Sequence, residues 1–325
     1  MPTILVTGGA GFLGSNLVSL LLENEQNTVI AMDSLWTGSM DSIASVKDNP
    51  RFRFIRHNVT DKFPEEVGHV DRIFHLACPA SPKRFPEAPL GILNTCFEGT
   101  RNVLELAAKT GARVLLASTS EIYGDPLICP QPETYHGNTN PFGPRSCYDE
   151  GKRVAEALAY AFQKQQNVDI RIARIFNAYG PGLRPDDGRV VSNFVVAALE
   201  GRNVEITGDG TASRCFQYVS DCVGGLATLM EGAYKRPVNI GCVEETTVGD
   251  LARIISEVVA RKTGRPQVQI SLTAKREDDP YRRVPDISVA KKELGWGPKV
   301  DLAKGLADTV DWFIANKLYE VPVSA

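Results

Sequence analysis

The stretch Ile4-Leu5-Val6-Thr7-Gly8-Gly9-Ala10-Gly11-Phe12-Leu13-Gly14 decides the fold of this chain. The apolar run at its start predicts a buried strand, the glycines predict a tight turn, and the residues that follow predict a helix. Backbone N–H groups and the positive end of the helix dipole at such a turn can hold a pyrophosphate. Gly8 permits the turn, Gly11 lets phosphates approach the backbone, and Gly14 lets helix and strand pack closely.

A second apolar run, residues 29–32, ends in Asp33. The Asp33 carboxylate can accept hydrogen bonds from a ribose diol and would repel a 2′-phosphate, and no arginine follows directly to neutralise such a phosphate. The two motifs together predict a dinucleotide site that takes NAD rather than NADP. The alternative is that the glycines serve only a turn and that Asp33 merely ends a strand.

Composition excludes several classes of protein. The chain has 325 residues, of which 43% are hydrophobic, and its formal net charge of −3 offers no general attraction to nucleic acid or an anionic membrane. Its seven cysteines have no Cys-x-x-Cys or metal-ligand spacing, which argues against a disulfide framework and a zinc site. We find no bilayer-spanning apolar run and no signal-like segment. We therefore expect a cytoplasmic protein without nucleic-acid, membrane or metal partners.

Strand-like and helix-like segments alternate along the first half of the chain. Further strands are predicted near residues 53–55, 72–76, 113–117 and 170–173, and helices near 91–109 and 148–165. This alternation predicts an α/β fold, a doubly wound parallel (Rossmann) sheet. Shorter helices near 190–200, 248–262 and 302–316 predict a smaller C-terminal α/β lobe. We expect an NAD-binding domain at residues 1–176, with a returning segment near 212–236, and a mainly substrate-binding lobe at 177–325.

A phenol and an ammonium lie four residues apart in Tyr148-Asp149-Glu150-Gly151-Lys152. On a helix both project from one face, so Lys152 should favour the phenolate and make Tyr148 a base near neutral pH. Such a pair is common by chance. Its position gives it weight, because it follows a predicted strand that ends in Thr119, Ser120 and Glu121 at the same sheet edge as the glycine turn.

On these residues the sequence resembles the extended short-chain dehydrogenase/reductases, in which Tyr and Lys act with a Ser or Thr in hydride transfer between NAD and a sugar hydroxyl. The hydroxyl that matches is Thr119. Further blocks are similar to the UDP-glucuronate decarboxylases within that family; they span residues 75–82, 143–153, 174–177, 187–194 and 278–287. The resemblance runs from the glycine turn to Gly295-Trp296, nearly the whole chain.

One position separates the relatives. The dTDP-glucose dehydratases carry Asp-Glu after the Thr, whereas this chain has Ser120-Glu121. The resemblance therefore implies decarboxylation: NAD oxidises carbon 4 of the sugar, the resulting β-keto acid loses carbon dioxide, and the same NADH returns its hydride to give UDP-xylose. Glu121 has two open roles, since it could be ionised and repel the substrate carboxylate, or protonated by a raised pKa and shuttle a proton.

The resemblance also implies which residues form the site. It implies cofactor contacts from Gly8, Gly11, Phe12, Leu13, Gly14, Asp33, Asn58, Leu76, Tyr148 and Lys152. It implies catalytic roles for Thr119, Glu121, Tyr148, Lys152 and Arg283, and substrate contacts from Ser120, Asn177, Arg189, Asn193, Arg214 and Arg283. Without the family blocks, these residues have simpler interpretations. Asn193 would be a residue at the start of a helix, Arg214 a solvated charge at the end of a strand, and Arg283 part of a basic run on the surface.

Two departures from the decarboxylase pattern concern the cofactor. Leu35-Trp36 stands where the family usually has Phe-Phe, and Asn58 stands where it usually has Asp. A nucleotide-sugar 4-epimerase or 4,6-dehydratase of the same fold is the nearest rival interpretation. A non-catalytic NAD-binding sensor is a weaker rival, because Thr119, Tyr148 and Lys152 are all present.

The helix that begins at Tyr148 carries two stripes of small or apolar residues. One runs through Ala155, Ala159 and Phe162, and the other through Val154, Leu158 and Ala161. Two stripes predict burial on two sides of the helix. We therefore expect a homodimer in which this helix and the helix near 91–109 pack against their symmetry mates.

Overall fold

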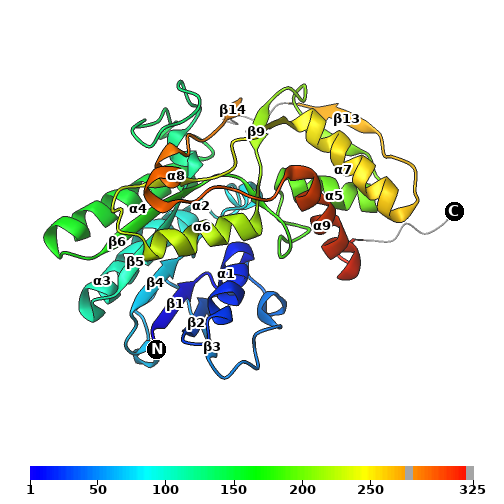
Figure 1. Ribbon diagram of the computed structural model, residues 1–325. Helices are drawn as coiled ribbons and strands as arrows, with labels where there is room; N and C mark the ends of the chain where they lie inside the picture. Colours follow the sequence, from blue (N-terminus) through cyan, green and yellow to red (C-terminus); the bar gives the residue numbers. More distant parts are fainter. Residues whose placement is uncertain (275–280, 320–325) are drawn as a thin grey trace.

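Seven parallel strands form the central sheet of the protein in a computed structural model, which describes residues 1–274 and 281–319 (Figure 1). The strand order is β11-β6-β5-β4-β1-β2-β3. The strands are β1 (Thr3–Thr7), β2 (Thr28–Asp33), β3 (Phe52–Arg56), β4 (Arg72–His75), β5 (Arg113–Thr119), β6 (Ile170–Ile175) and β11 (Val238–Ile240). Every strand predicted from the sequence is confirmed, as is the doubly wound α/β fold, and β11 is an addition.

Helices cover both faces of this sheet. Helices α1 (Phe12–Glu23) and α6 (Val219–Glu231) pack on one face, where Val6 and Leu115 point. Helices α3 (Thr100–Thr110) and α4 (Ser146–Gln165) pack on the other, where Leu5 and Leu116 point. Because neighbouring strand residues face opposite ways, the inner strands are buried on both sides and β1 and β2 are largely apolar, whereas the edge strand β3 carries two arginines and is mostly not buried.

The helix predicted near 91–109 is confirmed, and it contains a π-helical turn that the sequence did not indicate. The structure has α2 (Pro89–Asn94), a π-helical turn (Thr95–Gly99) and then α3. The Thr95 hydroxyl donates to the Gly91 carbonyl at 2.7 Å, and a Cβ on Gly99 would lie 2.7 Å from a Val59 methyl. The π-helical turn thus packs closely against residues that are distant in the sequence. The period of apolar residues along the helix contains no information about such contacts.

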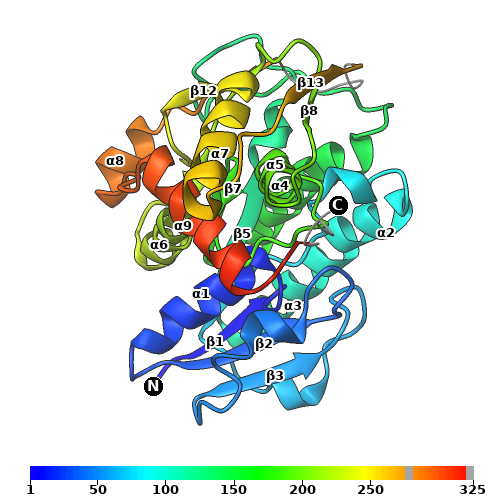
Figure 2. The same ribbon diagram turned by 90° about the vertical axis from the view of Figure 1, so that its right-hand side faces the viewer.

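A second group of elements lies beyond the carboxyl ends of the strands (Figure 2). The helices predicted there are confirmed as α5 (Val190–Leu199), α7 (Val248–Thr263) and α9 (Leu302–Ala315). They share an apolar core that includes Val195, Leu251 and Leu306. The remaining strands are β7 (Ala178–Tyr179), β8 (Val204–Thr207), β9 (Ser213–Cys215), β10 (Gln217–Tyr218), β12 (Glu245–Thr247), β13 (Ile270–Thr273) and β14 (Arg282–Arg283), and α8 (Ser288–Leu294) packs against β11 of the central sheet. The division of the chain at residue 176 stays a prediction.

Among the residues that the structure describes, no helix combines the length and the apolar character needed to cross a bilayer. The block at 278–287 that carried part of the resemblance begins outside the described residues, with Asp278, Asp279 and Pro280. Residues 320–325 of the predicted second lobe lie outside them as well.

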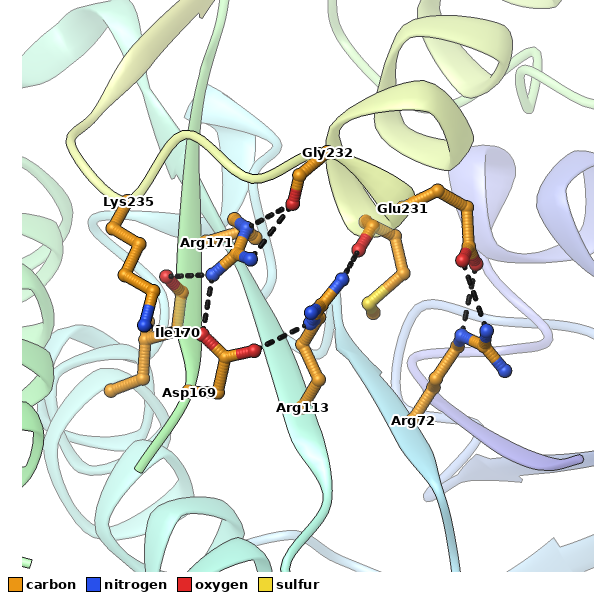
Figure 3. A network of polar contacts seen from close by, with 9 residues as sticks. Arg72, Arg113, Asp169, Ile170, Arg171, Glu231, Gly232 and Lys235 are labelled. Carbon is orange, nitrogen blue, oxygen red and sulfur yellow. Dashed lines mark hydrogen bonds and ion pairs between the residues drawn. The ribbon is translucent and has the colours of Figure 1, made fainter. Parts of the chain in front are cut away.

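Arginines at the amino ends of the strands hold the carboxyl end of α6 (Figure 3). Arg171 donates to the Gly232 carbonyl at 2.9 and 2.8 Å, and Arg113 donates to the Met230 carbonyl at 2.8 Å. Asp169 accepts from both guanidinium groups at 2.7 Å. Cations suit a helix carboxyl end because its last carbonyls lack partners within the helix. This network fixes α6 against the sheet at the edge opposite the glycine turn.

We expect Asp169→Ala to lower the free energy of unfolding by about 2 kcal/mol, because it leaves two arginines without their shared carboxylate. The Arg171 side chain is only 1% exposed, so water replaces the lost contact poorly. Glu231→Ala is the matched control, since Glu231 is 61% exposed and its ion pair with Arg72 should contribute about 0.5 kcal/mol or less. Urea denaturation measures the free energy of unfolding of both variants. Equal losses in the two variants would contradict the stabilising role of Asp169.

Candidate active site

One continuous cleft runs across the carboxyl ends of the central strands. It begins at the glycine turn after β1, passes Thr119 and Tyr148, and reaches Arg189 at the start of α5. In the sheet, β1 lies between β2 and β4, so the chain order reverses there. Ligands of open α/β sheets bind at this kind of reversal, outside the carboxyl ends of the strands. The topology therefore places the cleft where a dinucleotide site is expected.

The glycine turn has the shape that close backbone approach requires. Gly8 adopts a φ of +71°, and a Cβ on Gly14 would lie 2.0 Å from the Gly8 carbonyl oxygen, so no other residue fits there. Gly11 is the N-cap of α1 and supplies no side-chain hydrogen bond to the first turn. The first N–H groups of α1 are thus left without a side-chain cap at the wall of the cleft, as a phosphate-binding helix end requires.

Asp33 ends β2 and faces the same cleft. Its carboxylate accepts hydrogen bonds from the backbone N–H groups of Ala10 at 3.0 Å and Leu35 at 2.8 Å. Burial raises the pKa of Asp33, and the two N–H donors oppose this rise. Each carboxylate oxygen can accept a further hydrogen bond, so the group can hold the glycine turn and a ribose diol together.

We expect Asp33→Ala to weaken NAD binding roughly 10- to 100-fold, the effect of losing charge-assisted hydrogen bonds. Binding of NADP should weaken much less, because the same change removes the repulsion of its extra phosphate. Calorimetric titration with each dinucleotide measures the ratio of the NAD and NADP affinities. Asp33→Asn is the matched control, since it keeps an acceptor oxygen and removes only the charge. An unchanged NAD/NADP ratio in both variants would place the selectivity elsewhere.

Thr119, Tyr148 and Lys152 converge in the middle of the cleft. Thr119 ends β5, and Tyr148 and Lys152 stand one turn apart on α4, all three less than a tenth exposed. The Lys152 ammonium donates to the Ala117 carbonyl at 2.8 Å and lies 5.9 Å from the centre of the Tyr148 ring. The Thr119 side chain hydrogen-bonds to Tyr148. A hydroxyl, a phenol and an ammonium therefore line one wall, an arrangement suited to moving a proton from a substrate hydroxyl.

The expected lowering of the Tyr148 pKa toward neutrality is wrong. Burial raises the pKa of Tyr148 above its ordinary value, although Lys152 and Thr119 act in the opposite direction. Desolvation of a phenolate that is only 7% exposed outweighs the attraction of a single nearby ammonium. The spacing of Tyr148 and Lys152 along a helix contains no information about how deeply the phenol is buried, so the sequence alone did not indicate the raised pKa.

Glu121 stands two residues after Thr119 and lies between the side chains of two arginines. Arg283 donates to its two oxygens at 2.8 and 3.0 Å, and Arg145 lies 2.7 Å from the second oxygen. Burial alone would raise the pKa of Glu121, but Arg283 and then Arg145 lower it to about 2. Of the two roles left open for this residue, the ionised form is the one that this environment stabilises.

Arg145 is a site residue that the sequence reasoning missed. Its guanidinium also lies 5.6 Å from the centre of the Phe85 ring, which stacks on Tyr148 at 5.1 Å between ring centres. Asp149 lies beside it, with 3.7 Å between the Arg145 Nε and the carboxylate. Burial and the neighbouring Glu121 raise the pKa of Asp149 to about 7. The sequence did contain a signal for this pair, because Arg145 and Asp149 are four residues apart, on either side of Tyr148, and such a spacing brings two side chains together on a helix.

Most of the predicted site residues meet in the cleft. Those that line it are Gly8, Gly11, Phe12, Leu13, Gly14, Asp33, Asn58, Leu76, Thr119, Ser120, Glu121, Tyr148, Lys152, Asn177 and Arg189. Three others do not line it. Asn193 is exposed and donates to the Gly188 carbonyl, Arg214 is buried and donates to the carbonyls of Ser213 and Tyr281, and Arg283 reaches the cleft through Glu121. Cys78, Phe85 and Arg145 also line it.

Sequence comparison connects this geometry to known proteins. The family described as GDP-mannose 4,6 dehydratase matches residues 5–309. UDP-glucuronic acid decarboxylase 3 of Arabidopsis thaliana is 52% identical over 93% of this chain and 86% of its own length.

Solved structures of two related enzyme classes share the fold. The dTDP-glucose 4,6-dehydratase of Streptomyces venezuelae, solved with NAD bound, superposes with a TM-score of 0.88 and 30% identity over 97% of this chain and 98% of its own. The UDP-glucuronic acid 4-epimerase of Bacillus cereus, solved with UDP-glucuronic acid and NAD, gives a TM-score of 0.86 and 27% identity over 97% and 99%. Fold is thus common to decarboxylases, dehydratases and epimerases, whereas the identity to the decarboxylase is much higher.

Proposed function

This chain belongs to the UDP-glucuronic acid decarboxylases of the extended short-chain dehydrogenase/reductase family, and from that premise we propose how its cleft converts UDP-glucuronate into UDP-xylose and carbon dioxide. The enzyme is NAD-dependent and consumes no net NAD. The observation that carries the proposal is the presence of Thr119, Tyr148 and Lys152 in one cleft beside the ionised Glu121.

The residues of the glycine turn fit NAD. A Cβ at Gly8 or Gly14 would collide with backbone atoms, so the turn keeps the open backbone that a pyrophosphate needs. Asp33 would hold the adenosine ribose, and Lys152 stands in the cleft to bind the second ribose. NAD, when bound, supplies the acceptor for a hydride from carbon 4 of the sugar and later the donor that returns it.

Tyr148 is the base for the hydroxyl at carbon 4. Burial makes its phenolate a strong base once formed, and Lys152 and Thr119 stabilise that anion. Loss of the hydroxyl proton and a hydride leaves a ketone that is β to the substrate carboxylate, so carbon dioxide departs as an enolate forms. Tyr148 and Thr119 then stabilise the enolate oxygen by hydrogen bonding. Protonation at carbon 5 and return of the hydride complete the reaction.

Glu121 and Arg283 act on the carboxyl side of the sugar. An ionised Glu121 beside a substrate carboxylate destabilises the charged ground state, and loss of neutral carbon dioxide relieves the repulsion. Arg283 and Arg145 keep Glu121 ionised, and either guanidinium can share its hydrogen bonds with the incoming carboxylate. Asn177 and Arg189, which line the far end of the cleft, are placed to contact the nucleotide.

Mass spectrometry of the products formed from UDP-glucuronate and NAD, with proton NMR to read the configuration at carbon 4, tests the proposal. We expect the sugar nucleotide to lose carbon dioxide and to yield UDP-xylose. A product of unchanged mass with inverted carbon 4 would favour an epimerase, and no conversion at all would favour a sensor. A 4-keto pentose that accumulates with NADH would mean that the hydride is not always returned.

We also propose that the enzyme is a homodimer. Leu90 and Leu93 of α2 and Phe97 of the π-helical turn are 74%, 37% and 37% exposed, and they lie beside α4, whose Tyr160 is 63% exposed. Large apolar side chains gathered on two adjacent helices are typical of a buried interface. Helix α4 also carries the two stripes of small or apolar residues that the sequence analysis singled out.

Light scattering should return twice the mass of the chain, and Leu90→Asp should return a monomer. Leu127→Asp is the matched control, because Leu127 is equally exposed, at 81%, and lies in a different segment. A wild-type monomer at working concentration would contradict the dimer. Equal effects of the two substitutions would contradict the choice of interface.

We place the enzyme in a reducing cytoplasm. All seven cysteines are free in the structure, and five of them are not paired within hydrogen-bonding distance of another sulfur. Proteins of oxidising compartments use such residues in disulfides. Imaging of a tagged chain tests this assignment, and a signal confined to the secretory pathway would contradict it.

A further inference from the structure

Two cysteines that the proposed mechanism does not use lie next to each other at the cleft. Cys78 follows β4 in the segment that lines the cleft and is half-buried. Cys96 lies behind it in the π-helical turn and is 2% exposed. Their sulfur atoms are 3.4 Å apart, so they are already in contact. Of the seven cysteines, Cys78 is the one that lines the cleft, and it is therefore the member of the pair that a small dissolved molecule can reach.

The surroundings give the two thiols opposite characters. A hydrogen bond from Cys96 lowers the pKa of Cys78 to about 7, with Lys152 adding to this effect against burial. The pKa of Cys96 is raised well above its usual value by the same hydrogen bond and by burial. One sulfur is thus a nucleophilic thiolate near neutral pH, and its neighbour stays a protonated thiol. Redox-active cysteines pair an accessible thiolate with a resolving thiol in this way.

We propose that Cys78 and Cys96 form a peroxide-sensitive dithiol that closes as a disulfide and reversibly inactivates the enzyme. The Cys78 thiolate attacks a peroxide oxygen, the O–O bond breaks, and hydroxide leaves as Cys78 becomes a sulfenic acid. The Cys96 sulfur then attacks the Cys78 sulfur and expels hydroxide, which takes the Cys96 proton and leaves as water, so that the two steps together release one hydroxide and one water. The two sulfurs lose two electrons and the peroxide gains them.

Closing the bond strains the walls of the site. A disulfide is about 2.05 Å long, so the sulfurs must approach by about 1.4 Å. Cys78 adjoins Ala77, whose backbone would lie 2.8 Å from a Cβ on Gly8, and a Cβ on Gly151 would lie 3.0 Å from the Cys96 sulfur. The movement is therefore transmitted to the glycine turn on one side and to α4, beside Lys152, on the other.

The test treats the holoenzyme with hydrogen peroxide and follows decarboxylation and peptide masses together. We expect turnover to fall roughly tenfold to a hundredfold, as sub-ångström to ångström shifts of catalytic groups cause. A cross-linked peptide pair containing Cys78 and Cys96 should appear in parallel, and dithiothreitol should restore both the thiols and the activity.

Two variants separate the pair from general oxidation. In Cys96→Ala the cross-link should be absent, and oxidation of Cys78 should proceed to sulfinic acid that dithiothreitol does not reverse. Cys147→Ala is the matched control, a buried neighbouring thiol on α4 whose loss should leave the cross-link and its reversal unchanged. A wild-type enzyme that loses activity without a Cys78–Cys96 peptide, or that forms the cross-link and keeps its turnover, would overturn the proposal. Because these two outcomes are measured on the wild-type enzyme, the peptide map tests the proposal even if a variant misfolds.

Discussion

Tyr148→Phe should lower the rate of carbon dioxide release about 10³-fold, within the range that a positioned general base contributes, and leave NAD affinity nearly unchanged. The substitution removes the phenol oxygen that the Thr119 side chain and Lys152 surround. It keeps the ring, which stacks on Phe85 at 19° between planes, so the packing of the wall is retained. Steady-state assays with UDP-glucuronate and calorimetry with NAD measure the two quantities.

Tyr123→Phe is the matched control for this prediction. The Tyr123 side chain is fully buried and its hydroxyl donates to Asn239 at 2.8 Å, and neither residue lines the cleft. Its loss should reduce stability by about 1 kcal/mol and leave turnover within a few-fold of the wild type. If Tyr148→Phe retained most of the activity, or if the two variants behaved alike, Tyr148 would not be the base.

The parts of the fold that were predictable are those with a strong local signal. The run from Ile4 to Gly14 encodes a strand, a turn and a helix in consecutive residues, and Asp33 ends the next strand. The period of apolar residues distinguished the other long strands from the helices. These features depend on neighbours in the sequence, so one chain is enough to recognise them.

The missed elements depend on distant contacts. Strand β11 has three residues, too few for a periodic signal, and it is defined by pairing with β6. Helix α6 contains Gly224 and Gly225, which weaken a helical signal. A Cβ on Gly225 would lie 2.8 Å from Trp296, a residue far along the chain, so tertiary packing explains the glycine where helix propensity does not.

The same distinction applies to the site. The glycine turn and the Tyr148–Lys152 pair are local motifs, and their meeting at one sheet edge followed from the parallel topology. The pairing of Glu121 with Arg283 spans 162 positions and arises only because β14 pairs with β9 near the cleft. The family resemblance named both residues without implying that they bind each other, and the ionisation of Glu121 follows from that contact.

Arg283→Met should lower carbon dioxide release from UDP-glucuronate about 10²- to 10³-fold, the loss expected when a charged group that stabilises a reacting anion is removed. Arg283 is 3% exposed and holds Glu121 through two hydrogen bonds. Without it, Arg145 and the weaker attraction of Arg214 must offset both the Glu121 charge and the substrate carboxylate. Binding of plain UDP should change much less, because UDP carries no sugar acid. Calorimetry with UDP beside a turnover assay measures this selectivity.

A second substitution separates the two ways in which Arg283 could act. If the loss comes from a Glu121 charge that is no longer held by Arg283, then Arg283→Met combined with Glu121→Gln should recover much of the binding of UDP-glucuronate, since the unbalanced charge is gone. If Arg283 itself shares its hydrogen bonds with the substrate carboxylate, the double variant should bind as poorly as Arg283→Met alone. Equal losses for UDP and UDP-glucuronate in the single variant would instead make Arg283 a structural residue, and would reopen the epimerase interpretation.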